Sequence, residues 1–442
     1  MSRKHTEEKN ITSFDKSHTS NIFFTKPDKY KLLEEIAHKS KNMINIGSNL
    51  SYSPIGFYKD SLSIDIKNFN RVLEFDIKKK TITVEAGITL FELLNFTLVH
   101  NLWIPQLPGY PTITIGGAVA ANSHGKSCAA HGTIRRSIQS IKLFHKTHGW
   151  INLSEYENSE IFDLTIGGLG LTGSIVSVTL KLITIRGPRF VTQKKIVKSI
   201  KEIKKIIINS KQEPSYIYTW NRADDLKKFG EGVIYQNFEE KNFNSFQKFK
   251  KIKNNFKPLV FSLWNKYSIN FINFLYLKMN ELTRSEIKED FLKVIFPFYG
   301  NEYYFNFFGK KGFFESQLLI HDKNFDSFID EFKILFKKHE PTITLFSLKN
   351  MSGQQKYLRF EDNKICLTFD YTNSKKNLLF MSKVDSLYNK YEILPSIIKD
   401  SRLSKETFDT SYKEESLNFK NKLYEFDKKR IYRSEISNRL EL

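Results

Sequence analysis

Cysteine is nearly absent from this sequence of 442 residues, and this scarcity excludes a disulfide-stabilised protein. The two cysteines, Cys128 and Cys366, cannot form a disulfide framework, so a reducing compartment is the natural setting. The first twenty residues lack the apolar segment of a secretory signal, and no apolar run reaches the length of a bilayer span. We therefore expect a cytoplasmic protein, with peripheral attachment to the inner face of the membrane left open.

Acidic residues are scarce relative to basic ones. The chain has 69 Lys and Arg against 48 Asp and Glu, a formal net charge of +21. This excess favours an anionic partner, such as nucleic acid, a phospholipid surface or a phosphorylated substrate, although lysines that only decorate solvated faces would give the same total. Because no RNA- or DNA-binding module is recognisable, we expect no nucleic-acid partner.

Glycine is concentrated in a few segments, of which Leu102–Gly132 is the most informative. Gly and Ala leave backbone amides uncovered, so a ligand that carries phosphates can approach the main chain closely. Pro108–Gly109 and Gly116–Gly117 predict tight turns on either side of a β-branched run. His124 and Lys126 add an imidazole and a cation to the same surface. This composition predicts a loop that lines a cofactor rather than a strand of the core.

Two further glycine-rich segments support a ligand-binding role. The predicted strand Met43–Ile46 leads into Gly47–Tyr52, whose amides can form a concave turn for a pyrophosphate, although ordinary turns have the same composition. The segment Asp163–Ser174 has four glycines within seven residues, too many for a packed helix, and suits a loop against a flat ligand. No GxGxxG motif follows a strand, so a Rossmann site is not supported.

The order of the predicted elements indicates an α+β fold with two domains. Near the N-terminus, strands precede a helix instead of alternating with helices, and from residue 189 the composition shifts to Lys, Phe, Tyr and Asn. The second region predicts an antiparallel sheet covered by helices. We expect a flexible N-terminal arm (1–20), a cofactor-binding domain (21–188), a substrate domain (189–393) and a C-terminal segment (394–442). The predicted strands are 62–66, 72–75, 81–85, 138–144, 175–185, 314–320 and 365–370, and the helices are 29–37, 90–100, 325–338 and 376–391.

An insertion over residues 241–279 has two interpretations. Lysines come first and aromatic residues follow, which is typical of an element at a membrane interface. A helical insertion packed on the sheet would have the same pattern, so both interpretations stay open. The aromatic residues are Trp264, Tyr267, Phe271, Phe274 and Tyr276.

The segment PGYPTITIGGAVAANSHGKS, from Pro108 to Ser127, resembles the flavin-binding segment of the vanillyl-alcohol-oxidase superfamily of FAD-dependent oxidases. Within the superfamily, the likeness is greatest to the decaprenylphosphoryl-ribose 2′-oxidase branch, because KDSRLSKETF from Lys399 and the terminal RLEL also match. The resemblance implies a two-part FAD-binding domain, a substrate domain, and a C-terminal segment that returns to the FAD domain and the active site.

The resemblance also implies which residues hold the cofactor. In aldonolactone oxidases of the superfamily, a histidine at the position of Leu50 is often the covalent attachment point, so leucine predicts non-covalent FAD. Asn49 replaces a glycine that is usual there, and asparagine tolerates positive φ. The implied FAD-binding residues are Gly47, Ser48, Asn49, Ser51, Tyr52, Pro108, Gly109, Thr114, Gly116, Gly117, Asn122, His124, Gly125, Gly170, Gly173 and Ile175.

Lys399 is the predicted catalytic residue. Its own sequence context suggests only a surface ion pair with Asp400, but the resemblance places the family's essential lysine here. Such a cation can hydrogen-bond the substrate hydroxyl and stabilise the developing alkoxide, with action as a general base as a second option. Glu315 and Lys364 stand where the family has glutamine and asparagine, a departure that bears on sugar recognition. The implied substrate-binding residues are Lys126, Trp220, Glu315, Gln317, Lys364 and Cys366, the last as a residue that lines the pocket.

The resemblance therefore implies an FAD-dependent oxidoreductase that acts on a lipid-linked sugar phosphate. It would oxidise the 2-hydroxyl of a polyprenyl-phosphoryl pentose to a ketone, as the first half of an epimerisation in cell-envelope glycan synthesis. The implied partners are an NAD(P)H-dependent keto-reductase and an anionic membrane surface. The alternatives are an aldonolactone or sugar-alcohol oxidase of the same superfamily, and a non-catalytic scaffold that needs the cofactor.

Overall fold

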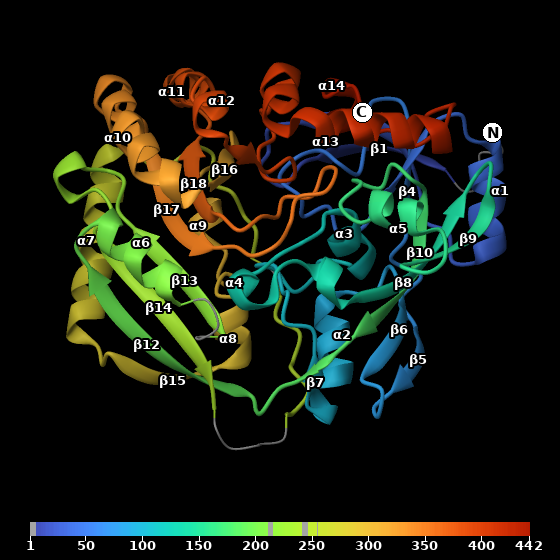
Figure 1. Cartoon of the computed structure of the whole chain (residues 1–442), viewed down its shortest axis with the longest axis horizontal. Coiled ribbons are helices and arrows are strands. Elements are labelled where there is room, and N and C mark those ends of the chain that lie inside the picture. The colour runs from blue at the N-terminus through green and yellow to red at the C-terminus, as the bar shows by residue number, and fades with distance from the viewer. Residues whose placement is uncertain (1–5, 211–214, 241–245, 254) are drawn as a thin grey trace.

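The computed structural model describes residues 6–210, 215–240, 246–253 and 255–442, and within them the fold is α+β. Three sheets of four, five and eight strands make up most of the strand structure. Figure 1 shows the two smaller sheets on one side of the molecule and the largest on the other. The observed architecture agrees with the predicted fold class.

The two smaller sheets come from the N-terminal part of the chain. The four-stranded sheet has parallel pairing of β4 with β2 and with β3, whereas every pair in the five-stranded sheet is antiparallel. In sheet order the strands are β1 (Glu7–Thr12), β2 (Thr19–Thr25), β4 (Leu62–Asp65) and β3 (Met43–Ile46), and then β5 (Val72–Asp76), β6 (Thr81–Glu85), β10 (Ser174–Lys181), β8 (Ile138–His145) and β9 (Gly149–Ser154).

The helices of this part lie between the strands of the smaller sheets along the chain. A capping box, in which Thr89 and Glu92 satisfy each other's backbone amides, fixes the start of α2. The predicted helix over 90–100 ends as a 3-10 helix over Leu98–His100. The helices are α1 (Tyr30–Lys39), α2 (Leu90–Thr97), α3 (Ile115–Ala120), α4 (Cys128–His131) and α5 (Ser159–Thr165), and a separate two-stranded pair joins β7 (Leu102–Trp103) to β11 (Ile183–Thr184).

The largest sheet is antiparallel throughout, as predicted. Its predicted strands 314–320 and 365–370 are confirmed as β16 and β18. In sheet order the strands are β15 (Glu286–Asp290), β12 (Arg189–Val197), β14 (Gly232–Glu239), β13 (Tyr216–Asn221), β17 (Ile343–Asn350), β18 (Ile365–Thr372), β16 (Phe313–Ile320) and β19 (Leu394–Pro395).

The two faces of this sheet have different neighbours, because successive side chains of a strand point to opposite faces. Phe314 and Leu318 of β16 join an apolar core with helices α6 (Ile200–Asn209), α10 (Asp322–His339) and α11 (Lys375–Asp385). Glu315 and Gln317 of the same strand face a cavity on the other side. On that side α7 (Lys266–Leu282) packs against β12 and β14. The remaining helices are α8 (Phe291–Ile295), α9 (Tyr303–Asn306), α12 (Tyr388–Tyr391), α13 (Lys405–Phe426) and α14 (Glu435–Arg439).

The expected flexible arm over residues 1–20 is wrong for its described part, residues 6–20. Strand β1 pairs along its length with β2, so its polar side chains stay exposed while its backbone groups are bonded. Asp15 is fully buried and accepts hydrogen bonds from Ser13 Oγ at 2.6 Å and Ser17 N at 3.0 Å. Its carbonyl accepts from Phe313 N, at 3.0 Å. The arm is therefore part of the folded molecule; residues 1–5 lie outside the described residues.

Two other expectations need correction. Gly116–Gly117 is not a tight turn but part of α3, which Thr114 caps by accepting from Gly117 N at 3.2 Å. The glycine is needed for packing, since a Cβ at Gly116 would press on Ala86. The boundary after residue 393 is also displaced, because β19 still pairs with β16. The chain leaves the large sheet only after Pro395.

The C-terminal segment lies against the N-terminal sheets. Met43 N donates to Ile431 O and Arg433 N donates to Met43 O, both at 3.0 Å. Closer to the cavity, Ser53 Oγ donates to Ile397 O at 2.6 Å. Figure 1 shows α13 and α14 running across this side of the molecule. These contacts hold residues 396–399 between the two halves of the chain.

Candidate active site

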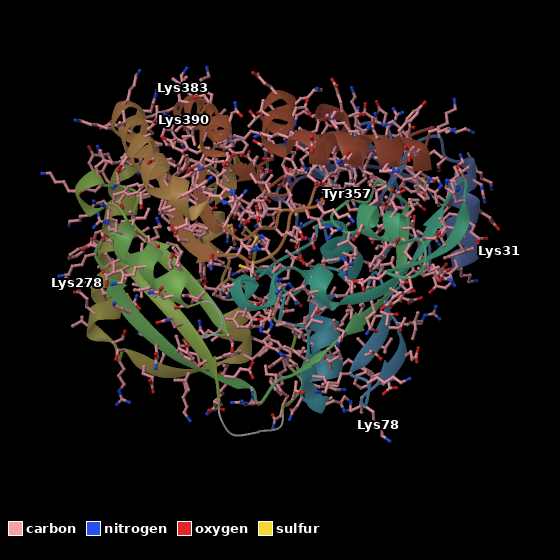
Figure 2. All side chains as sticks on the ribbon, viewed as in Figure 1. Lys31, Lys78, Lys278, Tyr357, Lys383 and Lys390 are labelled. Atoms are coloured by element: carbon pink, nitrogen blue, oxygen red, sulfur yellow. The ribbon has the colours of Figure 1, made fainter. Side chains whose placement is uncertain are left out.

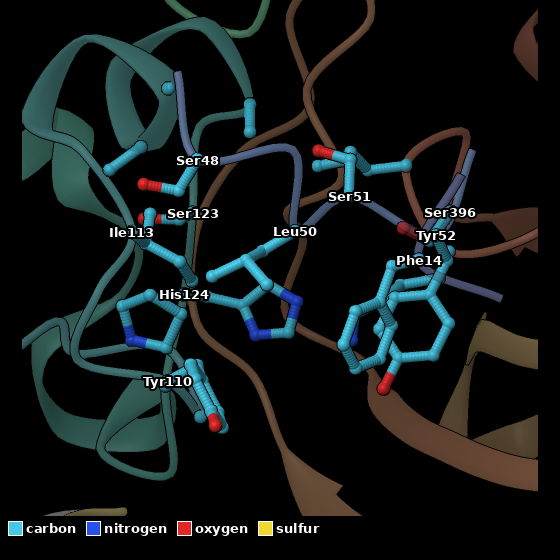
Figure 3. Close-up of a pocket in the computed structure, with 18 of the residues that line it drawn as sticks. Phe14, Ser48, Leu50, Ser51, Tyr52, Tyr110, Ile113, Ser123, His124 and Ser396 are labelled. Atoms are coloured by element: carbon cyan, nitrogen blue, oxygen red, sulfur yellow. The ribbon is translucent and has the colours of Figure 1, made fainter. Parts of the chain in front are cut away.

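A cavity of about 520 Å³ lies where the N-terminal loops, the large sheet and the C-terminal segment meet. This volume is within the range of small-molecule binding sites. Figure 3 shows side chains from these separate parts of the chain converging on it, among them Ser48, Leu50, Tyr52, His124 and Ser396. The three predicted glycine-rich segments all contribute to its lining.

At one contact between the first two segments and at one contact within the second, the neighbouring atoms leave room only for glycine. A side chain at Gly47 would overlap Thr114 Oγ1, and one at Gly125 would overlap the carbonyl of Leu107. Ser48 Oγ donates to Thr112 O and ties the first loop to the second. Asn49 has φ of 52°, the left-handed conformation that asparagine tolerates. The result is a narrow wall of exposed main chain, which suits a phosphate-bearing ligand.

Polar atoms without partners also face this region. Ser123 Oγ, Gln317 Oε1 and Asp370 Oδ1 are buried and have no hydrogen-bond partner among the described residues, and all three residues line the cavity. Buried polar groups are nearly always hydrogen-bonded in folded proteins. A polar ligand would supply the missing partners, so these atoms fit the presence of a bound cofactor and substrate.

Lys399 lies at the junction of the two halves of the cavity. Its Nζ is 3.1 Å from Glu315 Oε1 and 3.8 Å from the centre of the Tyr52 ring. Gln317 Nε2 donates to the same Glu315 oxygen at 2.9 Å. The expected surface pair with Asp400 is wrong, because Asp400 is fully buried and pairs with Arg402 at 2.7 Å. Asp400 thereby fixes the backbone, and the amine is left to reach into the cavity.

Glu315 has a second acid beside it on the neighbouring strand. Asp370 of β18 is its direct cross-strand partner, and Tyr304 OH donates to Asp370 Oδ2 at 2.9 Å. Burial and then the charge of Glu315 hold the pKa of Asp370 well above its usual range. This shift favours the protonated form of Asp370. The site thus places an acid paired with Lys399 beside a second acid with a raised pKa, on one face of the sheet.

His124 and two lysines form the other polar part of the lining. Lys349 Nζ donates to His124 Nδ1 at 3.2 Å, and burial followed by the charge of Lys349 holds the pKa of His124 well below its usual range. His124 is thus a neutral imidazole. Lys126 Nζ donates to Val294 O at 2.9 Å and lies 4.3 Å from the centre of the Tyr218 ring. Burial, with a smaller effect of Lys349, lowers the pKa of Lys126 to about 7.

Most of the predicted site residues line the cavity, and three do not. Cys366 is completely buried behind the lining, 3.9 Å from Thr368 Oγ1, and burial raises the pKa of its thiol to about 11. Lys364 pairs with Asp362 at 2.9 Å outside the cavity. Asn122 lies behind the lining with both amide atoms unpartnered among the described residues. All the other predicted residues, from Gly47 to Lys399, line the cavity.

The sequence analysis missed several residues of the lining. Phe14 comes from the supposed arm, and its ring centre is 5.1 Å from that of Tyr52. Nothing in the local sequence indicates this contact. Lys349 and Asp370 lie on β17 and β18 with their side chains toward the cavity. An acid within the apolar run Ile365–Asp370 was a signal that strand alternation could have used. Tyr110, in the glycine-rich loop, also lines the cavity.

Comparison with known proteins identifies the class of this site. Residues 28–154 match the family described as FAD binding domain, so the chain contains an FAD-binding domain. The chain is similar to decaprenylphosphoryl-beta-D-ribose oxidase of Mycolicibacterium smegmatis, with 29% identity over 190 residues, 42% of this chain and 41% of the relative. The domain match supports the resemblance to FAD-dependent proteins and FAD as the cofactor, and the similar protein is an oxidase by name.

Lactone-oxidising enzymes are also similar to this chain. L-galactono-1,4-lactone dehydrogenase of Brassica oleracea is 28% identical over 199 residues, which are 44% of this chain and 33% of that protein. L-gulonolactone oxidase of Mus musculus is 30% identical over 145 residues, 33% of this chain and 32% of that protein. The matched segments span less than half the length of these relatives.

Proposed function

We propose that this protein oxidises the 2-hydroxyl of a polyprenyl-phosphoryl pentose to a ketone, with FAD as the hydride acceptor. The observation that carries the proposal is the position of Lys399 Nζ, between the Glu315 carboxylate and the Tyr52 ring in a cavity lined by the FAD-binding segments. In this proposal, the N-terminal sheets form a two-part FAD-binding domain of the vanillyl-alcohol-oxidase type. The eight-stranded sheet with its helices forms the substrate domain.

The cofactor would be held by the two interlocking loops. The exposed main chain around Gly47 and Gly125 suits its phosphates, and the unpartnered Ser123 hydroxyl offers a further hydrogen bond. Leu50 lines the cavity between Ser48 and His124 (Figure 3) and has no atom that could bond to the flavin. We therefore infer that FAD is bound non-covalently. Bound there, FAD would supply the acceptor for the hydride of the carbinol carbon.

The residues around Lys399 would manage the hydroxyl proton. Oxidation of a secondary alcohol removes a hydride from carbon and a proton from oxygen. The Lys399 ammonium can hydrogen-bond the hydroxyl and stabilise negative charge as it develops on that oxygen. Glu315, paired with this lysine, is a carboxylate within reach to accept the proton. The raised pKa of Asp370 favours its protonated form, which would keep a second negative charge out of the same space.

The lining also supports a phosphorylated, lipid-linked substrate. Lys126 and Lys349 place two basic side chains in a cavity whose remaining surface is largely aromatic and aliphatic, which suits a phosphate attached to an apolar chain. In the family that the sequence resembles, glutamine stands at the position of Glu315. This difference bears on which sugar the site accepts. A keto-reductase that uses NAD(P)H would complete the epimerisation.

The alternative function is oxidation of a free aldonolactone or sugar alcohol. It is supported by the similarity to lactone dehydrogenases and oxidases. Leu50 and the KDSR segment favour the lipid-linked substrate instead. A non-catalytic scaffold would use the cofactor for folding alone and would have no need for the Lys399–Glu315 pair.

Anaerobic bleaching of the bound flavin tests the proposal. Purified protein would be mixed with a short-chain polyprenyl-phosphoryl ribose, and separately with a panel of aldonolactones and free sugars. We expect only the lipid-linked ribose to bleach the flavin. Bleaching by a lactone alone would overturn the substrate assignment, and no bleaching by either set would contradict the proposed reaction.

A variant identifies the residue responsible. Lys399→Met should slow bleaching by about 10²- to 10³-fold, the size of the loss when one transition-state hydrogen-bond donor is removed. Its flavin absorbance should stay that of the wild type. The matched control is Lys383→Met, which removes an exposed lysine of α11 far from the cavity. Equal loss in both variants, or no loss in Lys399→Met, would contradict the assigned role.

A further inference from the structure

Helix α7 and the segment before it expose an unusual number of large apolar side chains. The exposed fractions are 72% for Val260, 70% for Phe261, 84% for Tyr267, 60% for Phe271 and 65% for Met279. Other exposed apolar residues of the molecule are more scattered along the chain. We call these five residues the apolar surface of α7. A concentration of exposed apolar side chains along one short segment is typical of a site of interaction with an apolar partner.

The opposite face of α7 is firmly attached to the protein. Ile269, Asn273 and Leu277 are buried at helical spacing, and Asn273 Nδ2 donates to Asp224 Oδ1 at 2.8 Å. Its Oδ1 accepts from Trp220 Nε1 at 3.2 Å. Because the inner face of α7 is anchored by hydrogen bonds and core packing, Tyr267, Phe271 and Met279 on its outer face are held at the surface rather than exposed by fraying.

The segment that leads into α7 is rich in lysine, while α7 itself carries Glu281, paired with Lys278 at 2.7 Å. Residues 246–279 contain seven lysines and no Asp or Glu. Five of the lysines have no carboxylate within ion-pair distance in the described part of the chain, namely Lys248, Lys250, Lys251, Lys253 and Lys257. Figure 2 shows Lys278, on α7 itself, at the outer edge of the molecule. A surface with exposed aromatic side chains and uncompensated lysines is complementary to anionic lipid headgroups above an apolar layer.

The surface also lies next to the candidate active site. Tyr276 of α7 and Trp220, which contacts the inner face of the helix, both line the cavity. One helix therefore separates the apolar surface from the cavity. None of the described helices is long and apolar enough to cross a membrane, so attachment through α7 would be to one leaflet.

We propose that the apolar surface of α7 inserts into the headgroup layer of an anionic phospholipid bilayer, with the unpaired lysines of the preceding segment on the lipid phosphates. This inference rests on the proposed function, because a lipid-linked sugar phosphate presents its sugar at such an interface. Docked in this way, the protein has its cavity within one helix of the membrane. The sugar then enters the cavity while the lipid chain remains in the bilayer.

Vesicle flotation tests the inference with the full-length, FAD-loaded protein. The vesicles would be of phosphatidylcholine alone, or of phosphatidylcholine mixed with phosphatidylglycerol. We expect the protein to float with the anionic vesicles, to float less as salt rises, and to stay behind with the neutral ones. Replacing Val260, Phe261 and Phe271 together by serine should reduce the bound fraction by about tenfold or more, since the insertion energy depends on buried apolar area.

A matched control replaces exposed apolar residues on the other side of the molecule. Tyr156, Leu417 and Tyr424 have exposed fractions of 98%, 58% and 58%, and their replacement by serine should leave flotation unchanged. Equal flotation of the two triple variants would overturn the inference. Failure of the wild-type protein to float would also overturn it, as would self-association in solution that the α7 variant abolishes, since the surface would then bind a second copy of the chain.

Flavin bleaching by the short-chain substrate separates this inference from the proposed function. The α7 variant should retain full flavin absorbance and the wild-type bleaching rate, because none of its three residues lines the cavity. Bleaching without flotation would reject the membrane surface and leave the enzyme intact. Flotation without bleaching would reject the substrate and leave the membrane surface in place.

Discussion

The two faces of the eight-stranded sheet carry opposite kinds of side chain, although the same strands build both. On β18, Phe369 points into the apolar core beneath the helices, whereas its neighbour Asp370 points into the cavity. On β16, Leu318 and Gln317 divide in the same way. Side chains alternate along a strand, so each residue that faces the cavity has a core residue on either side of it. The packing of those core residues therefore fixes the position of the residue that faces the cavity. Stability and chemistry therefore reside in adjacent positions and can be changed separately.

The largest expected effect comes from a change on the apolar face. Phe369→Ala leaves a hole between Phe332 and Phe346, whose ring centres are 5.6 and 6.4 Å away. We expect the free energy of unfolding to fall by about 3–5 kcal/mol, the usual cost of truncating a buried Phe. Urea denaturation followed by fluorescence measures it.

The matched control lies one residue away on the other face. Thr368→Ala removes a small side chain that lines the cavity. We expect it to cost no more than about 1 kcal/mol of stability and to change substrate binding instead. A similar loss of stability in the two variants would contradict the division between the faces.

Glu315→Gln should have the next largest effect, now on the cavity face. It keeps the shape of the side chain but removes the carboxylate paired with Lys399. We expect the anaerobic rate of flavin reduction to fall by about 10²-fold, the low end of what a general base contributes, with flavin binding and unfolding free energy unchanged. Stopped-flow absorbance measures the rate.

The pH dependence distinguishes a base from a residue that only positions Lys399. A base must be ionised, so the wild-type rate should rise with pH on the acid side, and this rise should be absent in Glu315→Gln. Glu315→Asp should restore part of the rate and the rise. A glutamine variant with the wild-type pH profile would show that the carboxylate does not take the proton.

The sequence contained enough local information to locate the glycine-rich loops that line the cavity, and most strands. Gly47 and Gly125 lie where glycine is sterically required, and both belong to segments that are recognisable in the sequence by their glycine content. Lys399 was different: its neighbours suggested a surface pair with Asp400, and only the resemblance to a family indicated its role. Its actual partner, Glu315, is 84 residues away in the chain.

The remaining errors come from contacts that local sequence does not encode. Strand β1 is polar because it lies at the edge of its sheet with backbone pairing on one side, so its composition resembles that of a loose arm. Phe14 reaches Tyr52 only because that strand is in place. Gly116–Gly117 is helical because Ala86 and the Thr114 cap favour it, whereas a glycine pair by itself predicts a turn.

The smallest expected effect sharpens the comparison between the two acids of the cavity face. The pKa of Asp370 is raised in the folded protein. The folded state therefore keeps this proton at pH values above about 3.9, where the unfolded chain loses it. The stability that this proton contributes is fully present below that pH and is lost as pH rises toward the folded pKa. Asp370→Asn cannot ionise but can still accept from Tyr304. Relative to the wild type, its melting temperature should therefore rise as pH increases above about 4, by scanning calorimetry, whereas the exposed Asp330→Asn should follow the wild type. If the melting temperatures of Asp370→Asn and the wild type changed with pH in parallel, Asp370 would be ionised in the folded protein. Glu315 and Asp370 would then both be charged.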